Sequence, residues 1–315
     1  MLLDERTLGN VMRKAWQLIR ETVSESLNDN VMRLSAALSY YAVFSLAPLL
    51  LIAIAVAGAV FSEQAASGLV ASELEASIGR TAAEAVQEML VRSQTNADNI
   101  VATIVGIVMM IFGAGGVFYQ LQDALNTVWG LTAKPGLGIR GMLRDRAVSF
   151  SMVLGVGFLL LVSLVLTTTL QAMNSMISEM IPLHPLFWSV VGSVISFAVV
   201  TLLFAAIFQV LPDAEIAWRD VWLGAIVTAA LFTIAKFGLS WYLSREATSS
   251  TYGPAGALVL IMLWVYFSSI ILLVGAEFTQ VYARSRGHGI KPSPHAVRVD
   301  RSERIIQEGN KPVLR

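Results

Sequence analysis

Two ionisable residues lie inside long apolar runs, and they are the first candidates for chemistry. Lys236 is the one basic residue deep within such a run, and Glu277 closes another, directly after Gly275 and Ala276. A charged side chain at the centre of a bilayer costs about 2.5 to 3.5 kcal/mol on insertion scales, so such residues are functional candidates by default. We therefore treat both as candidate substrate-binding or coupling residues.

Each of these residues has a structural reading beside the functional one. Lys236 either snorkels toward the outer headgroups or presents a positive charge to a cavity that holds a lipid phosphate or carboxylate. Glu277 is either a proton or cation site or the buried partner of Arg219 or Arg146. Lys236 is expected about two-thirds of the way across the membrane and Glu277 near the cytoplasmic boundary, so the two do not form a direct pair.

Two further polar residues and a set of helix-distorting residues complete the candidates. Asp123 and Asn126 are about one helical turn apart, share a face with Tyr119, and are placed to hydrogen-bond across the cytoplasmic ends of a helix bundle. The helix-distorting residues predict a kink or a close helix contact beside a cavity. They are Pro48, Gly113, Gly115 and Gly116.

Composition excludes several kinds of chemistry. The chain has no cysteine, which removes disulfides and thiolate zinc sites, and its three histidines, His184, His288 and His295, do not cluster. No phosphate-binding loop of the GxxxxGK[ST] form is present. We expect no metal and no cofactor.

The candidates are positioned by long hydrophobic helices. The run from Leu38 to Phe61 has no charged residue over the roughly 20 positions that a helix needs to cross a bilayer. The whole chain is 56% hydrophobic and 14% charged, against about 25% charged for a soluble domain. The sequence predicts an all-α, polytopic integral membrane protein with six transmembrane helices, at residues 38–61, 100–119, 147–170, 187–211, 221–243 and 255–278.

Polar segments flank this membrane domain, which we place at residues 34–283. Residues 1–33 predict a basic amphipathic helix, which either lies on the anionic inner leaflet or packs as a solvated helix on the bundle. Residues 62–98 carry two capping-box patterns and predict a small helical cap on the periplasmic side. Residues 284–315 predict a flexible cytoplasmic tail.

The basic residues predict the orientation. With six spans, 18 of the 22 Lys and Arg residues fall on the side that holds both termini, and 3 fall on the other side. By the positive-inside rule both termini are cytoplasmic.

Five segments of the chain resemble the YihY/BrkB family of bacterial inner-membrane proteins, once labelled ribonuclease BN. The resemblance covers about residues 30 to 285, in order and at family-like spacing. The segments are SYYAVFSLAPLLL (39–51), FGAGGVFYQLQDALNTVWG (112–130), LPDAEIAWRDVWLGA (211–225), YGPAGALVLIMLWVY (252–266) and LLVGAEFTQVYA (272–283). The resemblance implies a six-helix inner-membrane protein with both ends in the cytoplasm, and a role in the cell envelope.

Two functions remain open at this stage. The first is a transporter or translocator of a lipid-like or other envelope component, which uses a cavity near Pro48, the glycine run and Lys236. The second is a non-transporting scaffold in envelope assembly or serum resistance. An ion channel is a weaker third, because no span shows a repeated ring of polar residues.

The old nuclease label does not agree with the residues. Phosphodiester hydrolysis usually needs a cluster of carboxylates and histidines, or a positioned acid–base pair, and the sequence offers neither. We therefore expect no enzyme activity. The expected partners are membrane lipids and envelope proteins, without nucleic acid, and the sequence does not specify an oligomeric state.

Overall fold

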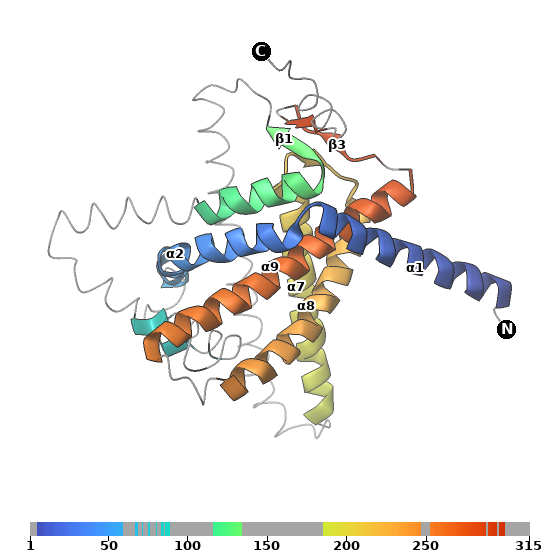
Figure 1. The fold of residues 1–315 in the computed structure, drawn as a ribbon. Helices are drawn as coiled ribbons and strands as arrows, with labels where there is room; N and C mark the ends of the chain where they lie inside the picture. Colours follow the sequence, from blue (N-terminus) through green and yellow to red (C-terminus); the bar gives the residue numbers. More distant parts are fainter. Residues whose placement is uncertain are drawn as a thin grey trace, which may run out of the picture.

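The computed structural model of the protein describes residues 5–58, 116–133, 185–246, 253–287, 289–294 and 296–299, and single helical residues between 67 and 88. The described part is mostly helical (Figure 1). Its helices are α1 (Glu5–Asn28), α2 (Val31–Gly58), residues 116–128, α7 (Pro185–Val210), α8 (Trp218–Glu246) and α9 (Gly253–Ser285). Four short strands, β1 (Leu131–Ala133), β2 (Ala214–Glu215), β3 (Lys291–Pro292) and β4 (Ala296–Arg298), gather at one end of the bundle, which we call the strand end.

Three helices in the described residues are long and apolar enough to cross a membrane. They are Val190–Val210, Trp218–Gly238 and Leu258–Ser285. Large apolar side chains on these helices point outward, among them Ile234 and Phe237, which are 71% and 73% exposed. Such surfaces suit contact with lipid and not with water. The predicted spans 187–211, 221–243 and 255–278 fall on these helices, whereas most of span 100–119 and all of span 147–170 lie outside the described residues.

The predicted helix over residues 1–33 is interrupted, and this corrects its boundary. α1 ends at Asn28, and α2 begins at Val31. Asn30 between them has a φ of 54°, a left-handed conformation that asparagine tolerates better than most residues. The Asn30 carbonyl then accepts the amide hydrogens of Arg33 and Leu34, which starts the next helix.

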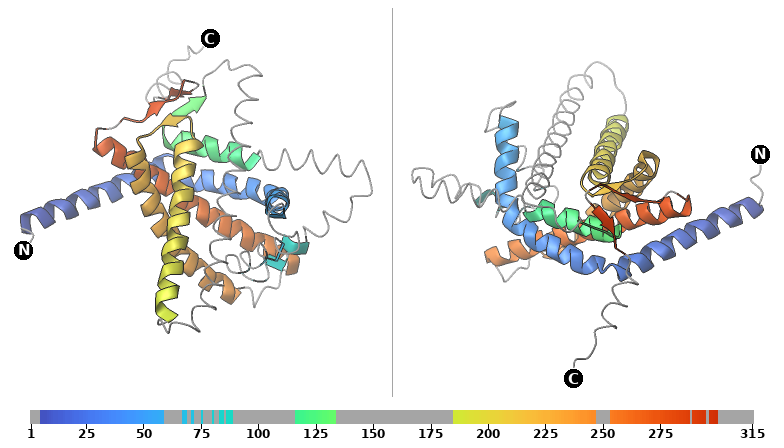
Figure 2. Two further views of the ribbon diagram at one scale, coloured as in Figure 1. Left: turned by 180° about the vertical axis from the view of Figure 1, so that it is seen from behind. Right: turned by 90° about the horizontal axis from the view of Figure 1, so that it is seen from above.

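α2 continues as a helix through Pro48 and changes direction between its two halves (Figure 2). A proline inside a helix removes one backbone hydrogen bond and crowds the preceding turn, which bends the helix without ending it. That Pro48 causes the bend of α2 stays a prediction.

α8 and α9 approach closely because small residues face hydroxyl-bearing residues on both helices. A Cβ atom added to Gly224 of α8 would overlap Thr279 of α9, and one added to Gly275 of α9 would overlap Thr228 of α8. Each threonine hydroxyl donates a 2.7 Å hydrogen bond to the carbonyl of the glycine four residues before it. Both hydroxyls are thus satisfied within their own helices. The two antiparallel helices pack through this reciprocal contact of two Gly-x-x-x-Thr segments, which we call the α8–α9 interlock.

A polar contact joins three segments at the strand end. The Asn126 amide donates a 2.9 Å hydrogen bond to the Asp213 carboxylate, and its oxygen accepts the Asp213 backbone N–H at 2.9 Å. Gln122 donates to the same carboxylate at 3.3 Å, and the Asp213 carbonyl accepts the Ser293 N–H at 3.0 Å. Asp213 therefore ties helix 116–128 and the C-terminal strands to the turn between α7 and α8.

An apolar core lies beneath this polar contact. Trp129 is 1% exposed, packs edge to face on Phe208 of α7 with ring centroids 6.4 Å apart, and its indole N–H donates to the Ala276 carbonyl of α9 at 3.4 Å. The end of helix 116–128 is thereby packed against α7 and α9. Burial of the indole without a partner for its N–H would be costly, so the Ala276 carbonyl matters despite the long distance.

Part of the predicted flexible tail is ordered, which corrects that prediction for residues 289–299. β4 pairs antiparallel with β1, and β3 pairs antiparallel with β2. Ile290 and Ala296 are buried, so these residues have apolar contacts that a solvated tail lacks. The remainder, from residue 300 onward, lies outside the described residues.

The interval 62–98 is described only at scattered residues, all of them helical. The Arg80 guanidinium donates to Glu84 at 2.8 Å in an exposed i,i+4 pair, and Ala83 and Val86 are buried. The helical cap and its side of the membrane stay predictions.

The α8–α9 interlock predicts that alanine substitutions at two glycines of α8 differ strongly in their effect on the stability of the protein. Gly224→Ala should destabilise the protein by about 1 to 3 kcal/mol, because the Cβ of Thr279 would lie 2.9 Å from the new methyl group and no change of rotamer removes it. Gly238→Ala is the matched control, since nothing lies within 4 Å of its added Cβ, and it should not lower stability. Thermal unfolding in lipid nanodiscs measures both, and equal midpoints for the two variants would contradict the interlock.

The Asn126–Asp213 contact predicts a second stability difference. Asn126→Ala should cost about 2 to 3 kcal/mol, because it leaves the Asp213 backbone N–H unpaired and leaves the carboxylate with the longer, 3.3 Å hydrogen bond from Gln122. Asp123→Ala is the control: the Asp123 side chain is exposed, and Thr127 bonds its backbone carbonyl, so the change should be within about 0.5 kcal/mol. The same unfolding measurement applies, and a neutral Asn126→Ala variant would show that the contact is dispensable.

Candidate functional site

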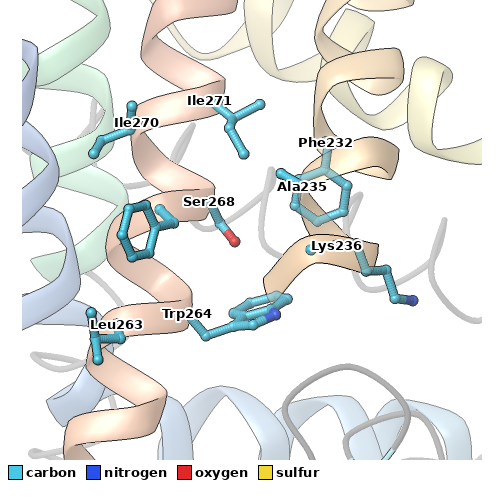
Figure 3. Close-up of a pocket in the computed structure, with 10 residues that line it drawn as sticks. Phe232, Ala235, Lys236, Leu263, Trp264, Ser268, Ile270 and Ile271 are labelled. Carbon is cyan, nitrogen blue, oxygen red and sulfur yellow. The ribbon is translucent and has the colours of Figure 1, made fainter. Parts of the chain in front are cut away.

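A pocket of about 480 Å³ opens between the second half of α8 and the first half of α9. Its walls are mostly apolar, with Phe232 and Ala235 from α8 facing Trp264 and Ile271 from α9 (Figure 3), and Phe267 of α9 also lines it. The Phe232 and Trp264 rings meet edge to face, with centroids 6.4 Å apart. The volume lies within the range of about 300 to 1,000 Å³ typical of small-molecule sites.

The α8–α9 interlock explains where the pocket lies. The helices are closest at Gly224, Thr228, Gly275 and Thr279, where small side chains bring the backbones together. Beyond this contact, toward the end of α8, aromatic side chains replace the small ones, and they cannot pack as closely. The pocket therefore occupies the space between two helices that are held together at one end.

Lys236 borders this pocket, and its ammonium group points away from the pocket interior. Figure 3 shows the side chain extending from α8 on the side opposite Trp264 and Ser268. Lys236 thus lines the pocket while its ammonium group lies outside the pocket interior, and whether it snorkels or binds an anionic group stays open. Ser268, whose hydroxyl points toward α8, supplies a polar atom inside.

Glu277 is a fully buried carboxylate. It is 0% exposed, and neither carboxylate oxygen has a hydrogen-bond donor among the residues that the structure describes. The charged groups whose fields reach it are Glu25 of α1 and Arg284 of α9. Of the partners expected for Glu277, Arg219 is exposed at the start of α8, and Arg146 lies outside the described residues.

Lys236 and Glu277 are distant from each other. The antiparallel register of the interlock places Lys236 opposite Phe267, ten residues before Glu277 on α9. Ten residues of helix span about 15 Å. The two ionisable residues therefore belong to separate sites.

The remaining predicted residues have different surroundings. Asn126 makes the expected bonds across the bundle, whereas Asp123 and Tyr119 are exposed. A Cβ atom added to Gly116 would lie 3.3 Å from the Tyr41 ring of α2, so the last glycine of the run does permit a close helix contact. Gly113 and Gly115 lie outside the described residues.

Sequence reasoning passed over two features of the site. The first is Asp213, which lies in the short polar turn after α7. Its position directly after Pro212 was the one feature of the sequence that could have indicated a role. The pairing of Gly224 and Thr228 with Gly275 and Thr279 shows only as two Gly-x-x-x-Thr patterns, which do not reveal that they contact each other. Among the described residues, no group of three or more His, Asp or Glu side chains could hold a metal ion.

Comparison with known proteins identifies relatives among bacterial membrane proteins. The chain is 27% identical to a UPF0761 membrane protein of Ralstonia nicotianae over 88% of its length, and 29% identical to one of Saccharophagus degradans over 84%. A third, from Cronobacter sakazakii, is 29% identical over 56%. The chain spans 61%, 59% and 58% of these three relatives. No solved structure matches it.

The family assignment rests on a longer match. The sequence model of the family described as virulence factor BrkB matches residues 22–300. This range contains α2, α7, α8 and α9, the pocket between α8 and α9, and Glu277. The protein is therefore a membrane protein of the virulence factor BrkB family.

Proposed function

We propose that this protein is a translocator of an anionic, lipid-like envelope component in the bacterial inner membrane. The observation that carries the proposal is the apolar pocket between α8 and α9, with Lys236 at its rim. An acyl chain suits the aromatic and aliphatic walls, and a phosphate or carboxylate headgroup suits the ammonium group just outside them.

The membrane arrangement belongs to the same proposal. Six spans with both termini in the cytoplasm agree with the excess of Lys and Arg at the strand end, which includes Lys291 and Arg298 on β3 and β4. In this arrangement the α8–α9 interlock lies in the cytoplasmic half and the pocket in the outer half of the membrane. A ligand would then enter the pocket through its lipid-facing side.

The protein acts without covalent chemistry in this proposal. The pocket contains a serine and a lysine but neither a paired acid and base nor a carboxylate within the residues that line it. Translocation requires only that the apolar part and the charged part of the ligand be accommodated together.

α1 provides an observation that favours the scaffold as a second candidate function. A stripe of apolar side chains on α1 is exposed, and Met12 and Trp16 are 70% and 68% exposed. The members of this stripe are Met12, Trp16, Ile19, Val23 and Leu27. In the translocator the stripe rests on the membrane surface, whereas in a scaffold it binds an envelope protein.

Filling the pocket tests the translocator. Ser268→Phe adds a ring inside the pocket and should lower translocation of a fluorescent phosphatidylglycerol in proteoliposomes at least tenfold. Ile234→Phe is the matched control, since Ile234 is 71% exposed on α8, and it should stay within twofold of wild type. Undiminished translocation by Ser268→Phe would exclude the pocket as the route.

The scaffold instead predicts that Trp16→Glu removes the cellular function while Ser268→Phe preserves it.

The absence of cysteine allows a direct test of orientation. Ser67→Cys, in the helical interval after α2, should react with a membrane-impermeant maleimide from the periplasmic side. Ser293→Cys, between β3 and β4, should react only after the inner membrane is opened. The reverse pattern would contradict the proposed arrangement, and the unmodified chain serves as a blank.

A further inference from the structure

Glu277 lies on a face of α9 that the α8–α9 interlock does not use. Gly275 and Thr279 point to α8, and Glu277 is two residues from each, which turns it about 200° around the helix. Leu273 and Val281, one turn away on either side, are buried on the same face. This face of α9 is covered by the N-terminal helices, because α1 and α2 both pack against α9.

Near the end of α9, this face makes an ion pair with α1. Arg284, two turns after Glu277, donates to Glu25 of α1 at 3.2 Å, and both side chains are partly exposed. Glu25 is therefore engaged with Arg284, and its negative charge acts against an ionised Glu277. In the α1–α2 turn, Asp29 is buried and already has an interaction partner. Arg33 of α2 and Arg219 of α8 are exposed, and Asp220 of α8 lies beyond the interlock on the opposite side of α9.

Two buried hydroxyls on the covering helices have no hydrogen-bond partner in the part of the chain that the structure describes. They are the Oγ atoms of Ser26 on α1 and Ser35 on α2, and Ser35 is 0% exposed. Buried polar atoms are normally paired, and an isolated buried carboxylate costs several kcal/mol. The fully buried, unpaired carboxylate of Glu277 therefore indicates that a positive charge completes its site, on the face of α9 that α1 and α2 cover.

We propose that Glu277 binds a monovalent cation, either a proton or Na⁺, on the face of α9 against which α1 and α2 pack. The bound cation neutralises the carboxylate. Binding holds α1 against α9 alongside the Glu25–Arg284 pair, and release of the cation leaves a buried negative charge beside Glu25, which weakens that contact. The site does not depend on what the α8–α9 pocket binds.

The test measures thermal unfolding of the full chain in nanodiscs as NaCl replaces choline chloride and as pH is varied. A Na⁺ site predicts that Na⁺ raises the wild-type midpoint by at least about 3 °C at constant ionic strength. A proton site predicts no effect of Na⁺ and a midpoint that falls by a similar amount as pH rises, because the unfolded chain releases this proton to water. In either case the unfolding midpoint of Glu277→Gln should no longer depend on Na⁺ or on pH in this way.

Glu215→Gln is the matched control, since Glu215 is exposed on β2 and should keep the wild-type response. A wild-type protein that responds to neither ion, or a Glu277→Gln variant that responds like wild type, overturns the proposal. If Glu277→Gln does not fold, labelling of wild type with an apolar carbodiimide replaces it. Modification of Glu277 that Na⁺ or high pH slows supports the site, and absence of modification under all conditions overturns it.

Discussion

The close approach of α8 and α9 is the constraint on which the described structure depends. Gly224 and Gly275 are each covered by a threonine of the other helix, and both threonine hydroxyls are satisfied within their own helices. In a membrane, where lipid is as apolar as the side chains, such small-residue contacts drive helix association through van der Waals packing. This contact sets the register that separates Lys236 from Glu277, and it leaves the pocket where the helices carry aromatic residues.

The strand end and the interlock support each other. Asn126, Asp213 and the Ser293 amide connect helix 116–128, the α7–α8 turn and the C-terminal strands, while Trp129 bonds the carbonyl of Ala276, next to Gly275. The start of α8 and the end of α9 are thus both held at the strand end. The pocket lies beyond these contacts, where aromatic side chains separate the two helices.

The sequence predicted the helices of the described part well and their contacts poorly. Hydrophobic length determines where a membrane helix can lie, so spans 187–211 and 221–243 match α7 and α8 within a few residues. The break at Asn30 depends on one left-handed residue, and the strands at 291–298 depend on pairing with segments far away in the chain. Lys236 and Glu277 were recognisable because charge is rare in apolar runs, but the burial of Glu277 against α1 and α2 requires the packing itself.

The central claim is that the pocket holds an anionic lipid-like molecule whose charge lies at Lys236. Native mass spectrometry with lipid identification tests it directly, on wild type and Lys236→Met extracted gently from their own membrane. Wild type is expected to retain one class of anionic lipid or lipid precursor and Lys236→Met to lose it, because the methionine keeps the apolar stem and removes the charge. Equal, non-selective lipid on both proteins would contradict the account.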